Sequence, residues 1–306
     1  MAVFSPIVQR PGDPNIYLWA DGRWFYYDTT YKPIGGGAMG TVYIGSSMDG
    51  RTKVAIKKVN DRYADQMSVR NRARLEASLA FRHPNMIEML GICEYPNRQG
   101  SIFMLSNYVS GYNIDKYIKY KGNIPNKEEF VAKKICKILD ALDYLHYRGV
   151  IHRDIKPSNI MIDEKTEEPK LMDLGIAKIF NTKASTVGFV GTPQYAAPEQ
   201  IHRTEDDDLL TPLVDIYALG VTFYELLVGF NPFDSDVEAE VLSNALMTNL
   251  PNNKLISRKM MKVLRKATEK DYKCRFQSAN EFKQAIEDAL ESKHGFIHKV
   301  FGFFNM

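Results

Sequence analysis

Cysteine is scarce in this sequence: Cys93, Cys136 and Cys274 are the only three among 306 residues, and they are far apart. Disulfide-rich domains and zinc ribbons need closely spaced cysteine pairs such as CxxC, so the sequence argues against both. Unpaired thiols fit a reducing compartment, and we therefore expect a cytoplasmic protein.

Long apolar runs and a large excess of one charge are also missing. No apolar stretch approaches the roughly 20 residues that a membrane-spanning helix requires, so we expect no transmembrane segment. The start of the chain has no apolar core of signal-peptide length. The 40 basic and 37 acidic residues leave a net charge of only +3. This balance provides no extended basic field, and we expect no nucleic-acid partner.

The chain has an ordinary globular composition, with 44% hydrophobic and 25% charged residues. These values exclude a coiled coil and a largely disordered chain. The pattern predicts short strands over the first 90 residues or so, and helices from about residue 113. The main predicted helices cover 66–81, 128–148, 215–228, 257–268 and 279–291. Such segregation of strands from helices predicts an α+β fold in two lobes.

Residues 1–30 are more aromatic than a passive tail requires. Asp21-Gly22 lies between two short apolar runs and is a good two-residue hairpin turn. We therefore expect a hairpin that packs on the strand-rich part of the chain. A regulatory or partner-docking role is the alternative interpretation.

The segment IGGGAMGTVY carries the pattern GxGxxG at Gly35, Gly37 and Gly40. A dinucleotide-binding loop would require a helix after these glycines, but TVYIG predicts a strand. A Walker A loop would require lysine where Thr41 stands. A third possibility is a hairpin whose backbone amides approach phosphates, with Val42 two residues after the last glycine. A plain glycine-rich turn remains an alternative from this segment alone.

Further polar motifs follow in order along the chain. Lys57 ends the apolar strand motif VAIK, and HRDIKPSN supplies Asp154, Lys156 and Asn159. Asp173 begins the segment DLG, in which a carboxylate precedes a hinge-capable glycine. The segment GTPQYAAPE, from residue 191 to 199, comes last.

Together, in this order and spacing, the motifs resemble a eukaryotic-type protein kinase of the serine/threonine class. The similarity covers about residues 31–290 and does not distinguish bacterial from eukaryotic members. It implies a bilobal fold with a small antiparallel-sheet N-lobe, which carries one main helix, and a larger, mostly helical C-lobe. The implied divisions are an N-terminal extension at 1–30, the N-lobe at 31–105, a hinge at 106–112, the C-lobe at 113–291 and an amphipathic tail at 292–306.

The resemblance implies ATP and Mg²⁺ as cofactors and the Ser or Thr hydroxyls of a protein substrate as acceptors. Asp154 would act as catalytic base, Lys156 would neutralise charge on the γ-phosphoryl, and Lys57 would hold the other ATP phosphates. Asn159 and Asp173 would bind magnesium through oxygen. The other residues expected at the nucleotide are Ile34, Gly35, Gly36, Gly37, Gly40, Val42, Ala55, Glu76, Asn107, Val109 and Met161.

One expected partner of Lys57 is out of register. The family places a helix glutamate about nine residues before the position of His83, where this chain has Arg74. We assign the role to Glu76, which requires a shorter turn between the helix and the next strand. The alternative is that the pair is not made in some states.

Two further assignments remain open at this level. Alignment of SNYVSG with the hinge places Ser106 at the gatekeeper position, where a small side chain would open a back pocket beside adenine. A one-residue slip would place Leu105 there instead. The second assignment concerns a basic stretch of four arginines, Arg70, Arg72, Arg74 and Arg82. We assign this stretch to a solvated face, and the alternative is a landing site for a phosphorylated loop or an acidic partner.

Several contacts in the C-lobe follow from the same resemblance. Thr192 should hold the catalytic loop, and its place in GTPQY favours Ser/Thr over Tyr acceptors. Glu199 and Arg275 should form a buried ion pair. Asp215 should tie down the catalytic-loop backbone from the start of the central helix.

Three further segments bear on regulation and partners. Autophosphorylation is expected in the loop 176–192, at Thr182, Ser185 or Thr186, with Arg153 binding the phosphate. The acidic run 205–208 is assigned to an exposed loop, with attraction of basic substrates as alternative. In the tail, one helical face could cover the domain itself, bind a partner or rest on a membrane surface. That face comprises Phe296, Val300, Phe301 and Phe304.

Two other functions compete with a protein kinase. A pseudokinase would act as a nucleotide-binding scaffold without turnover, and its usual sign is the loss of a catalytic residue. Lys57, Asp154, Asn159 and Asp173 are all present, so only the unusual register of Glu76 favours it. A small-molecule phosphotransferase would use a similar catalytic loop, but the GTPQYAAPE segment, which resembles a peptide-binding loop, argues against it.

Overall fold

A computed structural model describes residues 5–37, 40–64, 66–78, 81–95, 100–173, 178–179, 192–201 and 210–302. Within these ranges it leaves out the side chains of residues 68, 72, 75–78, 178–179 and 292–302. The chain divides into two compact units, unit 1 (Met1–Ser110) and unit 2 (Gly111–Met306). This division falls inside the segment 106–112 that the sequence predicts as a hinge.

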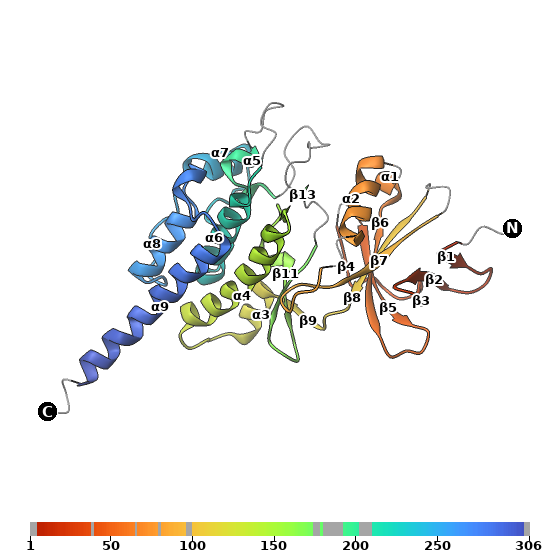
Figure 1. Cartoon of the computed structure of the whole chain (residues 1–306), viewed down its shortest axis with the longest axis horizontal. Helices are drawn as coiled ribbons and strands as arrows, with labels where there is room; N and C mark the ends of the chain where they lie inside the picture. Colours follow the sequence, from red (N-terminus) through yellow and green to blue (C-terminus); the bar gives the residue numbers. More distant parts are fainter. Residues whose placement is uncertain are drawn as a thin grey trace. The chain divides into compact units, whose positions relative to one another are not determined.

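Unit 1 is an antiparallel sheet with two helices beside it (Figure 1). Its elements are β1 (Ile7–Gln9), β2 (Asn15–Ala20), β3 (Arg23–Asp28), β4 (Gly35–Gly37), β5 (Gly40–Ser47), β6 (Lys53–Val59), α1 (Asp61–Ala64), α2 (Met67–Ser78), β7 (Met89–Glu94) and β8 (Ile102–Asn107). The strand order is β1-β2-β3-β5-β6-β8-β7, and β4 pairs with the first half of β5.

The N-terminal hairpin is confirmed, and it belongs to this sheet. β2 and β3 pair around Asp21 and Gly22, whose φ angles of 49° and 70° match a two-residue hairpin turn. β3 continues the sheet by pairing with β5. Alternation along the strands buries one row of side chains, which includes Leu18 and Phe25, and leaves Trp19 and Trp24 in contact on the other face.

The sheet has a hydrophobic cluster on each face. One cluster joins Ala73 of α2 to Met104 of β8, so this is the face that α2 covers. The opposite cluster joins Leu18 and Phe25 of the N-terminal strands to Leu105 of β8. The strands before residue 30 therefore supply half of the buried residues in this second cluster.

Unit 2 is mostly helical (Figure 1). Its elements are β9 (Gly111–Asn113), α3 (Ile114–Lys121), α4 (Lys127–Tyr147), β10 (Val150–Ile151), η1 (Pro157–Asn159), β11 (Ile160–Asp163), β12 (Pro169–Leu171), β13 (Lys178–Ile179), η2 (Pro193–Tyr195), α5 (Pro198–Ile201), α6 (Leu213–Val228), α7 (Glu238–Met247), α8 (Arg258–Ala267), η3 (Tyr272–Cys274) and α9 (Ala279–Gly302).

The core of unit 2 forms around α6. This helix is apolar on nearly every side, and α4 and α8 both pack against it, while α9 packs against α4 and α8. The predicted α+β fold, with a strand-rich N-terminal unit and a helical C-terminal unit, is confirmed.

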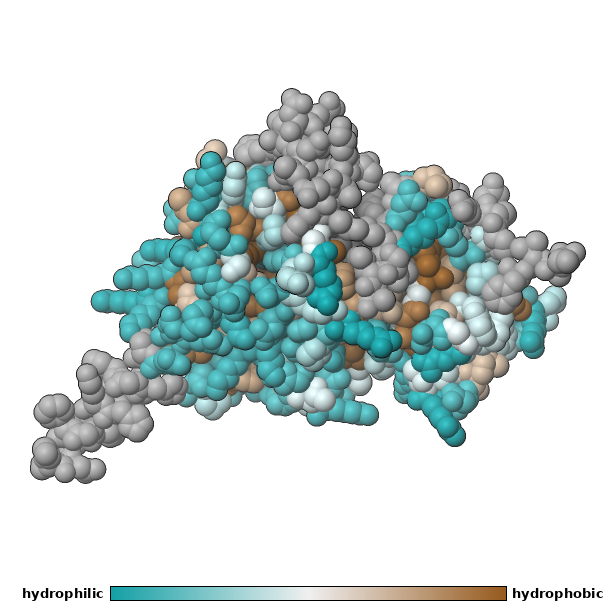
Figure 2. Space-filling model, in the orientation of Figure 1, coloured by the Kyte–Doolittle hydropathy of each residue, from teal (hydrophilic) through white to brown (hydrophobic). Residues whose placement is uncertain are grey.

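The surface of unit 2 in Figure 2 is mainly hydrophilic, with hydrophobic residues in small separate patches. Among the residues that the structure describes, no helix combines the length and apolar character needed to cross a bilayer.

Candidate active site

The glycine segment of unit 1 forms a hairpin. Gly35 lies opposite Val42, and Gly37 lies opposite Gly40. Because a strand follows the glycines, the dinucleotide-binding alternative is wrong. Only glycine fits at position 40, since a Cβ there would lie 2.4 Å from the carbonyl oxygen of Lys58. Ala38 and Met39, at the tip, lie outside the described residues.

Strand register brings several predicted nucleotide residues of unit 1 to one face. Val42 lies opposite Lys57, and Lys57 lies opposite Met104. Directly paired residues of neighbouring strands point to the same face. Ala55 and Ser106 form the next pair on that face, which α2 also covers.

The register also decides between the two gatekeeper assignments. Ser106 shares a face with Ala55 and Lys57, whereas Leu105 is fully buried in the cluster on the other face. Leu105 therefore does not lie on the face that carries Lys57, and the alternative alignment that makes it the gatekeeper is wrong.

After β8 the backbone presents a donor where the hinge is predicted. The N–H groups of Asn107 and Tyr108 donate to the carbonyl oxygens of Glu88 and Lys53 at 3.0 and 3.3 Å. The side-chain amide of Asn107 also donates to the Glu88 carboxylate at 3.1 Å. By contrast, the N–H of Val109 has no hydrogen bond to another described residue, so it can serve a ligand.

In unit 2, the residues after β10 form a hydrogen-bonded cluster around Asp154. The Nδ2 of Asn159 donates to Asp154 Oδ2 at 2.9 Å and to the Asp154 carbonyl at 2.7 Å. The Thr192 hydroxyl donates to Asp154 Oδ1 at 2.9 Å. Lys156 Nζ lies 2.8 Å from Asp154 Oδ2 and 2.6 Å from Thr192 Oγ1. The structure thus brings together the predicted base, its lysine and the predicted loop-holding threonine.

Asp215, in the first turn of α6, binds the backbone of this loop. It is fully buried and accepts hydrogen bonds from the N–H groups of His152 and Arg153 at 2.9 and 2.8 Å. Nε2 of His146 lies 2.8 Å from the same carboxylate. Burial opposes the ionisation of Asp215, but the contacts with His146 and the main chain outweigh it and hold its pKa below the ordinary 3.8.

The segment of Asp173 is tied to the same loop. His152 contacts the Met172 carbonyl through Nε2 at 3.0 Å, and the Met172 N–H donates to the Asn159 carbonyl at 3.0 Å. Arg153 and Asp173 have φ angles of 71° and 64°, a left-handed conformation that is uncommon outside glycine. Such strained backbone gathers at functional sites.

The predicted ion pair between Glu199 and Arg275 is confirmed. The guanidinium donates to both carboxylate oxygens at 2.6 and 2.8 Å, and it also donates to the carbonyls of Leu213, Glu269 and Lys270. Arg275 is only 1% exposed. It therefore ties α5 to the start of α6 and to the turn before η3.

The assignment of the basic stretch to a solvated face is wrong for two of its residues. Arg70 is fully buried, and both Arg70 and Arg74 bind Glu94 of β7. Sequence reasoning missed this use of Glu94, because nothing in the local pattern marks it. The two helix arginines are therefore engaged within unit 1.

Glu76 lies in α2, but its side chain lies outside the described residues. Since Arg74 binds Glu94, Arg74 does not take the place of the expected glutamate beside Lys57. Met161 lies in β11, paired with Asn113 of β9. The other assignments outside the described residues are Thr182, Ser185, Thr186, the acidic run 205–208 and the tail side chains of Phe296, Val300, Phe301 and Phe304.

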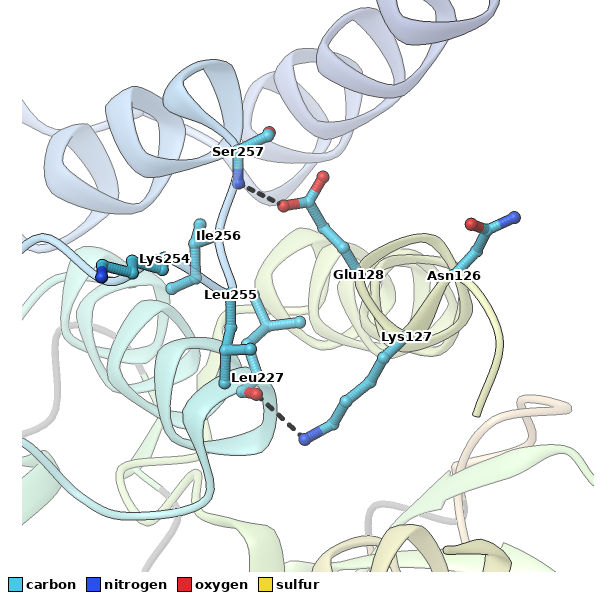
Figure 3. A pocket seen from close by; sticks show the side chains of 8 residues that line it. All are labelled: Asn126, Lys127, Glu128, Leu227, Lys254, Leu255, Ile256 and Ser257. Atoms are coloured by element: carbon cyan, nitrogen blue, oxygen red, sulfur yellow. Dashed lines mark hydrogen bonds between the residues drawn. The ribbon is translucent and has the colours of Figure 1, made fainter. Parts of the chain in front are cut away.

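A cavity of about 340 Å³ lies elsewhere in unit 2, between α4, α6 and α8 (Figure 3). Lys127 Nζ donates to the Leu227 carbonyl at 2.9 Å, and the Ser257 N–H donates to Glu128 at 2.6 Å. The first contact satisfies a backbone carbonyl at the end of α6, and the second satisfies the backbone N–H of the residue before α8. No predicted site residue lines this cavity.

Comparison with known proteins identifies the family. The protein kinase domain model matches residues 29–290. The serine/threonine-protein kinase PrkC of Bacillus subtilis is 31% identical over 269 residues, which are 85% of this chain and 40% of PrkC. The serine/threonine-protein kinase pkn3 of Myxococcus xanthus is 32% identical over 272 residues, 83% of this chain and 48% of the relative.

A eukaryotic relative gives the same picture. The probable serine/threonine-protein kinase MARK-C of Dictyostelium discoideum is 28% identical over 236 residues, 77% of this chain and 30% of the relative. The chain thus spans less than half the length of each of these three relatives. It belongs to the protein kinase family, and these relatives bear the names of serine/threonine kinases.

Proposed function

We propose that this chain is a serine/threonine protein kinase that transfers the γ-phosphoryl group of ATP to protein hydroxyls. The observation that carries the proposal is the cluster of Asp154, Lys156, Asn159 and Thr192, in which each contact matches a role that phosphoryl transfer requires. Phosphoryl transfer depends mainly on positioning and charge neutralisation, and the cluster offers both.

Asp154 is assigned as the catalytic base. Its two carboxylate oxygens accept hydrogen bonds from Asn159 and Thr192, so the carboxylate is held in one orientation. In the reaction the substrate hydroxyl oxygen forms a bond to the γ-phosphorus, the bond from that phosphorus to the bridging oxygen breaks, and the hydroxyl proton passes to Asp154. Lys156, 2.8 Å from Asp154 Oδ2, would neutralise charge on the transferred group.

The donor set of unit 2 fits a magnesium ion. Asn159 uses its Nδ2 for Asp154, which leaves its Oδ1 directed away from that bond as an oxygen ligand. Asp173 supplies a carboxylate, and Mg²⁺ is commonly held by one or two protein oxygens together with phosphate. When bound, the ion would neutralise phosphate charge at this site.

In unit 1, Lys57 is assigned to the ATP phosphates and Glu76 to Lys57. The shared face of Lys57, Val42 and Ala55 supports a nucleotide site there, with Asn107 and Val109 presenting backbone groups to adenine. Ile34, the glycines at 35–37 and 40, and Met161 complete the assigned contacts.

The direct test is phosphoamino-acid analysis after incubation with labelled ATP and magnesium, on the chain itself and on a basic protein. We expect phosphoserine or phosphothreonine with the wild type, and a loss of at least about a hundredfold in rate with Asp154→Asn. Asp143→Asn is the matched control, because Asp143 is an exposed aspartate of α4. It should retain the wild-type rate.

Other results would favour the competing functions. ATP binding without phosphate transfer by the folded wild type would indicate a pseudokinase scaffold. Transfer to a small molecule but to no protein would indicate a small-molecule phosphotransferase. Mapping the phosphorylated residues in the same samples tests autophosphorylation at Thr182, Ser185 and Thr186.

A further inference from the structure

We propose that Arg70, Arg74 and Glu94 form a clamp that fixes the rotation of α2 on the sheet, and that the clamp thereby positions Glu76 for Lys57. Arg74 and Glu94 are positioning residues, because they act through α2. The second half of this inference rests on the proposed function, whereas the first half concerns unit 1 alone.

The contacts of the clamp are directional. Arg74 binds Glu94 in a bidentate manner, with Nε 2.7 Å from Oε1 and Nη2 2.9 Å from Oε2. Arg70 Nη1 also donates to Glu94 Oε2 at 2.9 Å, and its Nη2 donates to the Gly100 carbonyl at 2.8 Å. A bidentate arginine–carboxylate pair fixes the relative orientation of its two groups as well as their distance. These bonds therefore join α2 to the β7–β8 edge of the sheet in one orientation.

Burial makes the clamp more than a surface ion pair. The Arg70 side chain is 1% exposed, and those of Arg74 and Glu94 are 29% and 20% exposed. Exposed ion pairs contribute little, but a buried guanidinium that loses its carboxylate is left uncompensated. The hydrogen bonds from Arg74, opposed in part by burial, hold the pKa of Glu94 below its ordinary value. Its carboxylate is therefore charged at neutral pH.

The clamp residues and the apolar residues of α2 lie on different sides of the helix. Arg70 and Arg74 are one turn apart on one side, while Val69 and Ala73 pack in the cluster on the sheet. A rotation of about 30° would move a guanidinium, roughly 6 Å from the axis, by about 3 Å and break its hydrogen bonds. Apolar packing alone tolerates such a rotation more easily, since it has no fixed direction. Glu76 belongs to the same helix, so its position follows the rotation of α2.

The first test needs no nucleotide. Hydrogen exchange of the α2 amides would be measured in the wild type, Arg74→Met, Arg74→Lys and the control Arg51→Met, whose arginine side chain is 87% exposed. We expect about tenfold faster exchange across α2 in Arg74→Met, a smaller change in Arg74→Lys, and none in Arg51→Met or in β5 and β6 of any variant. Arg74→Met keeps the Arg70–Glu94 bond, so the protein should stay folded. Unchanged α2 exchange in Arg74→Met would overturn the clamp.

The second test asks whether the clamp acts through Glu76. Phosphate transfer would be measured for Arg74→Met, Glu76→Gln and the double variant. We expect Arg74→Met to lower kcat about tenfold in the wild-type background and to have little further effect beside Glu76→Gln. An equal loss in both backgrounds would overturn the positioning role. Absence of activity in the wild type would instead count against the proposed function, while the exchange result would still stand.

Discussion

Asp215 shows how much a single buried carboxylate can organise. Its oxygens accept the N–H groups of His152 and Arg153, which are the two residues before Asp154. The loop conformation therefore depends on a charged group that has no contact with solvent. Its pKa is below 3.8 in the folded protein, so the stability it contributes is fully present above pH 3.8 and is lost as the pH falls through the folded value.

We predict that Asp215→Asn costs roughly 2 kcal/mol or more at neutral pH, because one buried backbone N–H would face an amide N–H instead of an oxygen. The variant should also lose less stability than the wild type as the pH falls below 3.8. Urea unfolding at several pH values measures both effects. Equal acid sensitivity of the wild type and the variant would argue against a lowered pKa at Asp215.

Ser106 is predicted to control access to a pocket beside adenine. A purine analogue with a bulky aromatic group should inhibit the wild type, and Ser106→Met should weaken that inhibition at least about tenfold while the KM for ATP changes little. Inhibition constants for the two proteins test this directly. Equal inhibition would mean that Ser106 does not border the nucleotide, and the hinge assignment would be wrong.

At the residue scale, the sequence predicted the polar motifs but not the clamp. Asp154, Lys156 and Asn159 lie within six residues, so one short pattern carries their geometry. Arg70 and Glu94 are 24 positions apart, and their contact depends on how α2 rotates against β7. No local pattern records that rotation, and the arginines therefore resembled a solvated face.

At the scale of elements, the N-terminal strands are part of the core of unit 1. The Phe25 side chain is fully buried in the same cluster as Leu105 and Ile56 of the central strands. The neighbouring residue Trp24 lies on the other face of β3, so alanine substitutions at the two positions compare the two faces of the strand.

We predict that Phe25→Ala destabilises the protein by about 3–5 kcal/mol, the usual cost of a cavity of this size in a core. Trp24→Ala should cost less, because its side chain is only partly buried. Thermal unfolding of the two variants provides the comparison. If Trp24→Ala proved as costly as Phe25→Ala, the outer face of the hairpin would have to be covered by another group.

Element prediction succeeded where the apolar pattern was strong. α4, α6 and α8 begin and end within two residues of their predicted bounds, since their buried faces repeat at helical spacing. α7 was missed because only Val241 and Ala245 are buried in it. β1 was missed because three residues are too few to show alternation.

At the scale of the whole molecule, the change from strands to helices near residue 110 coincides with the boundary between the two units. Composition and pattern therefore sufficed for the fold class. The sequence predicted the hairpin of β2 and β3, but not that it joins the sheet, because this depends on pairing between β3 and the end of β5. Such pairing is decided by the sheet as a whole.

The function proposed for the Asp154 cluster is the transfer of phosphate to Ser or Thr. The most direct measurement is the initial rate of labelled phosphate transfer from ATP to protein, in magnesium, for the wild type and Asp154→Asn at equal folded concentration. We expect phosphoserine or phosphothreonine from the wild type and a rate at least about a hundredfold lower from the variant. Equal rates from the two proteins, or phosphotyrosine as the product, would contradict it.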